Sequence, residues 1–216
     1  MKHSTDSVLP TKMTHALASD ITGGLSYHSK MPGSAWSIPA RHCITGSKLR
    51  SVVGSTCEKC YALKGRFAFP SVQASLERRL KSFDHPDWVE AMAFLIKDES
   101  WFRWLGSGDL QSEHMLLRIM DVCRRTPETR HWLPTREYAI VRKVVEATPV
   151  PKNLTIRLSA HMREQQVPRS LLGPGVVASN VGKSFYTCPA PQQDNQCGEC
   201  RKCWDRRVKN VTYKLH

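Results

Sequence analysis

Four of the eight cysteines of this chain lie close together near its C-terminus: Cys188, Cys197, Cys200 and Cys203. Thiolates are soft ligands that bind zinc or iron–sulfur clusters tightly. Zinc ribbons use two separated cysteine pairs, whereas cysteines at successive two-residue intervals, with a Cys-Pro nearby, are typical of the loop around a [4Fe-4S] cluster. The spacing therefore favours a [4Fe-4S] cluster, although the Cys-Pro here precedes the run. Zinc and a disulfide framework are the alternatives.

A second group of cysteines precedes the first in the chain and consists of Cys43, Cys57 and Cys60. Three thiolates are one short of a closed four-thiolate site, so a fourth ligand comes from elsewhere or one metal position stays open. An open position is what a catalytic metal requires. We expect these seven cysteines to be metal ligands that hold one or two clusters. The eighth, Cys123, lies on the apolar stripe of a predicted helix and is expected to be a buried free thiol.

The length of 216 residues suits one domain, or one domain with an appendage. A chain of this size buries enough apolar surface to fold without covalent staples. No apolar run is long enough for a signal peptide or a membrane span. We therefore expect a cytoplasmic protein with no membrane partner, in a reducing compartment where disulfides are rare.

The formal net charge of the chain is +13, which favours polyanionic partners such as nucleic acid. The tail from Glu199 to His216 carries six Lys/Arg residues against two acids. Five of these cations crowd around Trp204, whose ring could stack on a nucleic acid strand or cover a face of the cluster. Alternatively, the cations offset the negative charge of a ligated cluster. The basic surface therefore predicts a nucleic acid or a host protein as partner, or no partner if the cations serve the cluster.

Apolar periodicity predicts helices over Val72–Phe83, Val89–Ile96, Met115–Cys123 and Tyr138–Val145. Asp84 and Ser112 are the expected N-caps of the second and third helices. Short apolar or aromatic runs predict four strands: Trp101–Leu105, His131–Thr135, Leu154–Ser159 and Gly175–Ser179. Residues 1–40 and 47–55 are expected to be mostly loop.

Strands that alternate with helices indicate an α/β fold with parallel pairing and right-handed crossovers. Four strands are too few to close an eight-stranded barrel, so the sequence predicts a partial (open) α/β barrel over residues 1–187, with an N-terminal cysteine loop at 43–60. A cysteine-rich, metal-binding and basic segment follows at 188–216. The loops after parallel strands share one face. On that face we expect Gly106–Asp109, Arg136, Ala160-His161 and Asn180.

Several motifs together resemble phage proteins of the gene-product-88-like family. Ser55–Gly65 is similar to that family's CxxCYA-x-KG stretch, and Arg103–Asp109 and His131–Arg136 are similar to two of its strand motifs. Cys200–Trp204 also fits, and the resemblance covers about residues 25–205. It implies an iron–sulfur protein of phage or prophage origin, in the host cell cytoplasm, whose role is poorly defined.

A more distant likeness is to radical S-adenosylmethionine enzymes. Those enzymes bind a [4Fe-4S] cluster through three cysteines after the first strand of a partial barrel, and they carry Gly-Gly-Glu after the second strand. Here the cysteine spacing differs, and Ser107-Gly108-Asp109 stands where Gly-Gly-Glu would be. The likeness implies that Ser107, Gly108 and Asp109 bind S-adenosylmethionine. Otherwise they only form a strand-to-helix turn.

Two functions follow from these patterns. The first is an iron–sulfur protein on a partial barrel that is derived from, or still acts as, a radical enzyme. The second is a non-enzymatic protein, stabilised by zinc or a cluster, that binds nucleic acid or a host protein through its basic surface. The sequence contains no carboxylate pair at a recognisable spacing, no nucleophile elbow and no phosphate-binding loop.

Overall fold

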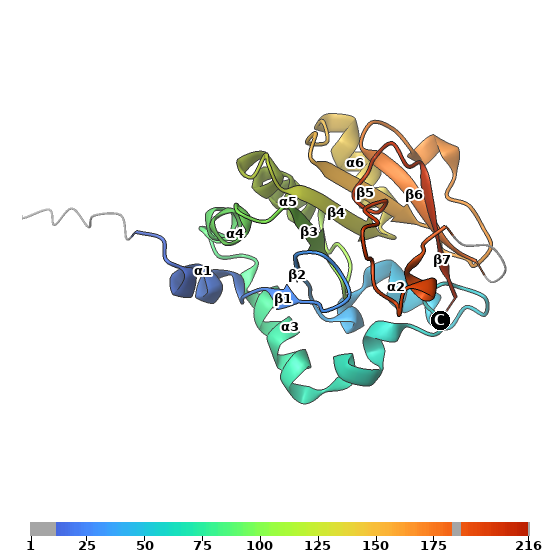
Figure 1. The fold of residues 1–216 in the computed structure, drawn as a ribbon, viewed down its shortest axis with the longest axis horizontal. Coiled ribbons are helices and arrows are strands. Elements are labelled where there is room, and N and C mark those ends of the chain that lie inside the picture. The colour runs from blue at the N-terminus through green and yellow to red at the C-terminus, as the bar shows by residue number, and fades with distance from the viewer. Residues whose placement is uncertain (1–11, 183–186, 216) are drawn as a thin grey trace, which may run out of the picture.

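The computed structural model describes residues 12–182 and 187–215, and their strands form one open sheet (Figure 1). Strands β1 (Ser26–Tyr27) and β2 (Ser34–Trp36) pair antiparallel, and every later pair is parallel. The order in the sheet is the order in the sequence. The remaining strands are β3 (Trp101–Trp104), β4 (Arg130–Thr135), β5 (Leu154–Ser159), β6 (Val176–Gly182) and β7 (Asn210–Lys214). The predicted α/β class with parallel pairing is confirmed.

The four predicted strands correspond to β3, β4, β5 and β6, and two parallel strands were not predicted. The first, β2, lies in the segment 1–40 that was expected to be mostly loop, so that expectation is wrong there. Its three residues carry no periodic signal, and they are held by pairing with β3 and by Glu99, which accepts from the backbone of Ser34 at 2.7 Å. The second, β7, lies within the cysteine-rich segment and pairs with β6.

The four predicted helices are all present: α3 (Pro70–Ser82), α4 (Trp88–Ile96), α5 (Glu113–Arg125) and α6 (Tyr138–Ala147). Ser112 is confirmed as the N-cap of α5, since its hydroxyl accepts from the Met115 backbone at 3.1 Å. The predicted cap at Asp84 is wrong. Backbone turns continue through His85, and α4 begins only after Asp87. Short 3₁₀ turns cover Ala40–His42, Tyr61–Leu63, Gly65–Ala68, Arg169–Leu171 and Ala190–Gln192.

Two further helices lie wholly or partly where loop was expected. Helix α1 (His15–Thr22) is capped by the Thr14 hydroxyl, and α2 (Ile44–Leu49) starts directly after Cys43. Both are short, and α2 contains a glycine, so neither shows a clear apolar stripe. No helix of the described residues is long and apolar enough to cross a membrane.

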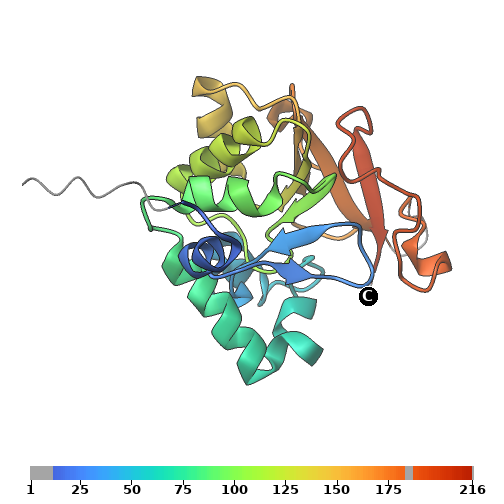
Figure 2. The same ribbon diagram turned by 60° about the vertical axis from the view of Figure 1, so that its left-hand side comes forward.

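One face of the sheet packs against helices and forms the hydrophobic core. Figure 2 shows α1, α4, α5 and α6 stacked along this side. Aromatic rings dominate the contact: Trp88 of α4 lies 5.2 Å from Trp36 and 6.1 Å from Trp104, measured between ring centroids. Cys123 is fully buried in this core, which confirms that it is a packed free thiol away from the other cysteines.

The opposite face of the sheet is covered by residues 188–209 of the cysteine-rich segment, which precede β7 and are drawn in orange-red to red in Figures 1 and 2. Trp204 packs edge-on against Trp101 at 5.7 Å and Trp132 at 5.2 Å, and its indole donates to the Phe102 carbonyl. Trp204 is only 3% exposed, so it has no free face for a nucleotide base. The interpretation of Trp204 as a stacking residue is therefore wrong.

Arg157 connects the sheet to this covering segment. Its side chain extends from β5, is fully buried, and donates hydrogen bonds to five backbone carbonyls at 2.5–3.1 Å. The acceptors are the carbonyls of Ala178, Lys202, Cys203, Asp205 and Val208. Hydrogen bonds to a charged donor are the stronger class, and here they offset the cost of burying the guanidinium.

We predict that Arg157→Leu lowers the free energy of unfolding by about 3–5 kcal/mol, because several buried carbonyls lose their donor at about 1–3 kcal/mol each. Urea denaturation of the two proteins measures the difference. Arg142→Leu is the matched control, since Arg142 is exposed and makes only a 3.9 Å contact with Glu146. It should cost less than about 0.5 kcal/mol. Equal costs for the two substitutions would contradict the role given to Arg157.

Candidate metal centre

The structure brings Cys43, Cys57 and Cys60 together at the carboxyl edge of the parallel strands, and this group is called the edge triad. The Sγ atoms of Cys43 and Cys57 each lie 3.6 Å from the position that a Cβ on Gly46 would occupy. Burial, with smaller contributions from Asp109, Cys60 and Cys57, raises the pKa of Cys43 to about 12. Deprotonation of the Cys43 thiol is therefore unfavourable unless a cation, such as a metal ion, compensates the charge.

The end of β4 anchors two of the three segments that carry the edge triad. Glu137 accepts from the backbone N–H of Thr45 at 2.8 Å and from its hydroxyl at 2.7 Å, two residues after Cys43. Arg136 donates from Nε to the Thr56 hydroxyl at 2.9 Å, next to Cys57. Both contacts join residues at least 80 positions apart. The cysteines are thus positioned by the sheet and not only by their own loop.

The third segment is anchored by Tyr61, which follows Cys60. Its hydroxyl donates to the Gly106 carbonyl at 2.6 Å, in the turn after β3. His161, in the turn after β5, bonds the Arg136 carbonyl at 3.0 Å and stacks on Tyr138. The predicted convergence of the loops after β3, β4 and β5 is therefore observed.

Asp109 joins the turn after β3 to the end of β4. Its carboxylate accepts from the backbone of Leu110 at 2.8 Å, the Thr135 hydroxyl at 2.5 Å and the backbone of Arg136 at 2.9 Å. Burial raises the pKa of Asp109 to about 6, and the hydrogen bonds from Thr135 and Arg136 oppose that shift. Both carboxylate oxygens of Asp109 accept hydrogen bonds from within the protein. This favours a role for Asp109 in the strand-to-helix turn over a role in binding S-adenosylmethionine.

The turn around Gly106 carries buried polar atoms with no partner among the described residues. They are Nε2 of His28, Oγ of Ser37, Nε of Arg103 and Oγ of Ser107. The first three lie 3.1–3.7 Å from the position that a Cβ on Gly106 would occupy. Unpaired buried polar atoms are uncommon and costly, and they often mark a site that a ligand or water completes. The predicted ligand residue Ser107 is one of them.

The four C-terminal cysteines form the second group, which is called the face group because it lies on the open face of the sheet. The thiols of Cys188, Cys197 and Cys200 interact electrostatically, and Cys203 interacts with Cys188. Burial raises the pKa of Cys203 to about 11, while the Tyr213 hydroxyl, 3.2 Å from its Sγ, opposes the rise. All seven predicted ligands thus fall into the two groups.

Arg103 lies between the edge triad and the face group. Its guanidinium stacks over Trp132 at 4.4 Å and donates to the Tyr61 hydroxyl at 3.4 Å, beside Cys60. Its charge also lowers the pKa of Cys197 and Cys203, against the larger effect of burial. Among the described residues, no three His, Cys, Asp or Glu side chains are arranged to hold a single metal ion.

Sequence reasoning missed the residues that position the thiols. Glu137, Tyr61 and Arg157 act on distant segments, so no spacing rule marks them. No local signal marks Arg157 either, because β5 alternates apolar and polar residues and Arg157 stands at one of the polar positions, where an exposed side chain is expected.

Gly108 packs so tightly that a side chain would disturb the turn after β3. A Cβ there would lie 2.3 Å from Cγ1 of Ile38 and 2.7 Å from its carbonyl oxygen, at a φ of +78°. Gly24 has the same φ with nothing within 4 Å, so it is the matched control. We predict that Gly24→Ala costs about 1 kcal/mol from backbone strain, and that Gly108→Ala costs a further 1–3 kcal/mol, roughly, from the overlap. Thermal melts of both variants test this, and equal losses would contradict it.

Comparison with known proteins places the chain in a family. No curated protein and no solved structure is significantly similar to it. A family model described as Gene product 88 matches residues 11–206, which include both cysteine groups and every parallel strand except β7. This match confirms the resemblance drawn from the motifs, and the chain belongs to the Gene product 88 family.

Proposed function

We propose that the chain is an iron–sulfur protein whose edge triad binds one [4Fe-4S] cluster and leaves one iron open to a small ligand. The observation that carries the proposal is the separate anchoring of the three cysteine-bearing segments to the sheet. Glu137 holds Thr45, Arg136 holds Thr56, and the Gly106 carbonyl holds Tyr61. A free cysteine loop needs no such support, whereas a three-thiolate site requires a fixed geometry.

The arrangement of the thiols supports a cluster better than a single zinc ion. Four thiolates on one zinc lie about 3.8 Å apart, given tetrahedral Zn–S bonds of about 2.3 Å. The described cysteines do not form such a set. A four-iron cluster separates its ligands more widely, because each thiolate binds a different iron. Zinc remains the alternative metal, and the thiolate donor set suits both.

The position of the triad supports a relationship to the partial barrel of radical S-adenosylmethionine enzymes. The triad follows β2, the first parallel strand, and the Ser107-Gly108-Asp109 turn follows β3, the second. The unpaired polar atoms of Ser37, Arg103 and Ser107 lie at that turn and offer hydrogen bonds to a polar ligand such as S-adenosylmethionine. When bound, the cluster would supply one electron to a ligand held there.

The face group supports a second cluster, with four thiolates and no open iron. Arg157 and Thr155 fix the backbone around Cys203, and the Tyr213 hydroxyl contacts its Sγ. Hydrogen bonds to ligand sulfur and exclusion of water set the potential of such a cluster. A non-enzymatic protein, in which zinc or a cluster only stabilises the fold, would use the same thiols. The enzyme and the non-enzymatic protein differ in one property: only the enzyme binds a ligand at Ser107.

Metal analysis tests the proposed clusters. We predict that anaerobically reconstituted protein contains four irons per cluster and equal acid-labile sulfide. Replacing Cys43, Cys57 and Cys60 together with serine should remove about half of the iron and sulfide, and so should Cys200→Ser. Cys123→Ser, the matched control, should retain all of it, because that thiol is isolated in the core. Colourless protein with stoichiometric zinc and no sulfide would refute the clusters.

Ligand binding separates the enzyme from the structural protein. We predict that S-adenosylmethionine changes the electron paramagnetic resonance spectrum of the reduced edge cluster, and that Ser107→Ala raises the concentration needed by about 5-fold, as for one lost hydrogen bond. The Ser107 hydroxyl has no partner within the described residues, so this variant should keep its melting temperature and its iron. A spectrum insensitive to S-adenosylmethionine would favour the non-enzymatic function.

A further inference from the structure

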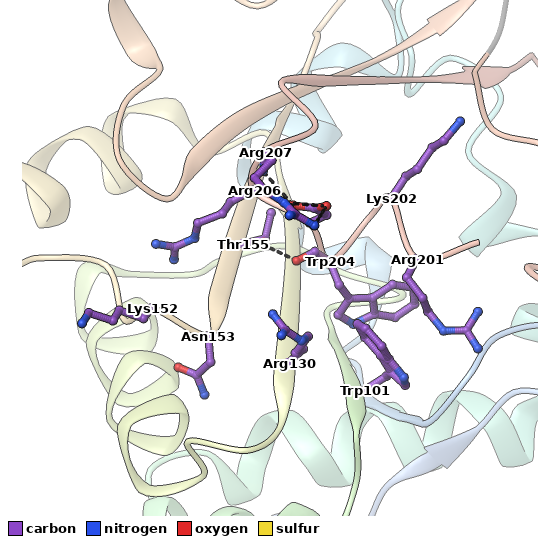
Figure 3. Close-up of a pocket in the computed structure, with 11 residues that line it drawn as sticks. Trp101, Arg130, Lys152, Asn153, Thr155, Arg201, Lys202, Trp204, Arg206 and Arg207 are labelled. Carbon is purple, nitrogen blue, oxygen red and sulfur yellow. Dashed lines mark hydrogen bonds and ion pairs between the residues drawn. The ribbon is translucent and has the colours of Figure 1, made fainter. Parts of the chain in front are cut away.

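A basic cleft of about 640 Å³ lies at the amino ends of β3, β4 and β5 (Figure 3). It is called the amino-end cleft, and it lies at the opposite edge of the sheet from the edge triad. Trp101 and Arg130 are the first residues of β3 and β4, and Lys152 precedes β5. The cationic residues that line the cleft are Arg130, Lys152, Arg201, Lys202, Arg206 and Arg207.

The positive charge of the cleft is largely unneutralised. The lining includes one carboxylate, Asp205, and Arg207 pairs with it at 2.9–3.2 Å. Arg130, Lys152 and Arg201 form no ion pair with a carboxylate of the described residues. Cations held close together repel one another, so an anion bound among them lowers the electrostatic energy of this region.

The guanidinium groups of the cleft are held in place before any ligand binds. Arg130 and Arg201 both lie over the Trp101 ring, at 6.0 Å and 5.5 Å from its centre. Arg206 donates to the carbonyls of Pro151 and Leu154, while its buried Nε has no partner among the described residues. Preorganised donors lose less side-chain entropy when they bind an anion. The guanidinium groups that line the cleft are therefore preorganised to bind an anion.

We propose that the amino-end cleft binds the phosphates of a single-stranded nucleic acid. Figure 3 shows Lys152 at one side, Arg130 in the middle and Arg201 at the other side, so the cations follow a path and do not converge on one point. This spacing suits successive phosphates of a strand better than one small anion. A duplex is read by an element that projects into its groove, and a concave cleft offers none.

Recognition in this cleft rests on charge and not on base identity. Trp204 is buried, and the Trp101 ring is accompanied by two guanidinium groups, so the aromatic lining holds cations in place. Contacts to phosphates carry no sequence information and weaken as salt rises. Arg130 and Lys152 are exposed and lie outside the cysteine-rich segment, so both can be changed without altering a thiol or its neighbours.

The experiment measures binding of a fluorescent 12-nucleotide strand, as DNA and as RNA, to the full anaerobically purified chain between 50 and 300 mM salt. The test variant is Arg130→Gln with Lys152→Gln. The control, Arg142→Gln with Lys143→Gln on α6, removes the same charge from two exposed residues that do not line the cleft. With about 0.7 unit of salt slope per phosphate contact, the test variant should lose about 1.4 units of slope and bind about 25-fold more weakly at 0.1 M salt. The control should match the unaltered chain.

Three outcomes would overturn the proposal. Equal weakening in both double variants would mean that overall charge, and not the cleft, attracts the strand. Inorganic polyphosphate that binds as tightly as either oligomer, and displaces it fully, would assign the cleft to a different polyanion. A test variant that loses iron while oligomer binding is unchanged would show that these cations serve the face group. Equal affinity of the protein for the DNA strand and the RNA strand would support the proposal, because the phosphodiester that both share is what is recognised.

Discussion

The buried guanidinium of Arg157 is the interaction on which the open face of the sheet depends. Among the described residues no carboxylate accepts a hydrogen bond from it, and backbone carbonyls of β6 and of the segment 202–208 surround it instead. A single side chain thereby fixes the path of the segment that carries Cys203 and Trp204. The indole then fills the space between Trp101 and Trp132. The positions of the face group and of the basic cleft therefore both depend on Arg157.

The thiols are arranged by the protein before any metal is present. Burial raises the pKa of Cys43, Cys57 and Cys203, so these groups are protonated thiols at neutral pH in the metal-free chain. A metal that bound these thiols would have to displace protons, so its apparent affinity would rise with pH. Arg103 lies between the two groups: its charge lowers the pKa of Cys197 and Cys203, and it donates a hydrogen bond to the Tyr61 hydroxyl beside Cys60.

Local signals in the sequence were sufficient for much of the fold. Ser112 and Cys123 were predicted because an N-cap and an apolar helical stripe depend on residues within a few positions. Strand β2 was missed because three residues carry no period, and Asp84 was misassigned because backbone turns continue through His85 and α4 begins only after Asp87. The type and density of the cysteines singled them out as candidate metal ligands, a role that stays a prediction. Arg136 was expected on the same face, but its contact with Thr56 and that of Glu137 with Thr45 were not predicted, since these partners lie at least 80 positions apart and only the folded sheet brings them together.

The order of the strands has a consequence for biosynthesis. Each strand pairs with the one made just before it, so the sheet can grow in the direction of translation. Strand β7 pairs last, and the cysteine-rich segment crosses the open face only when the chain is nearly complete. Until then the open face of the sheet is uncovered, whereas the strands that anchor the edge triad have already been made. The face group is therefore the second of the two cysteine groups to be assembled during synthesis.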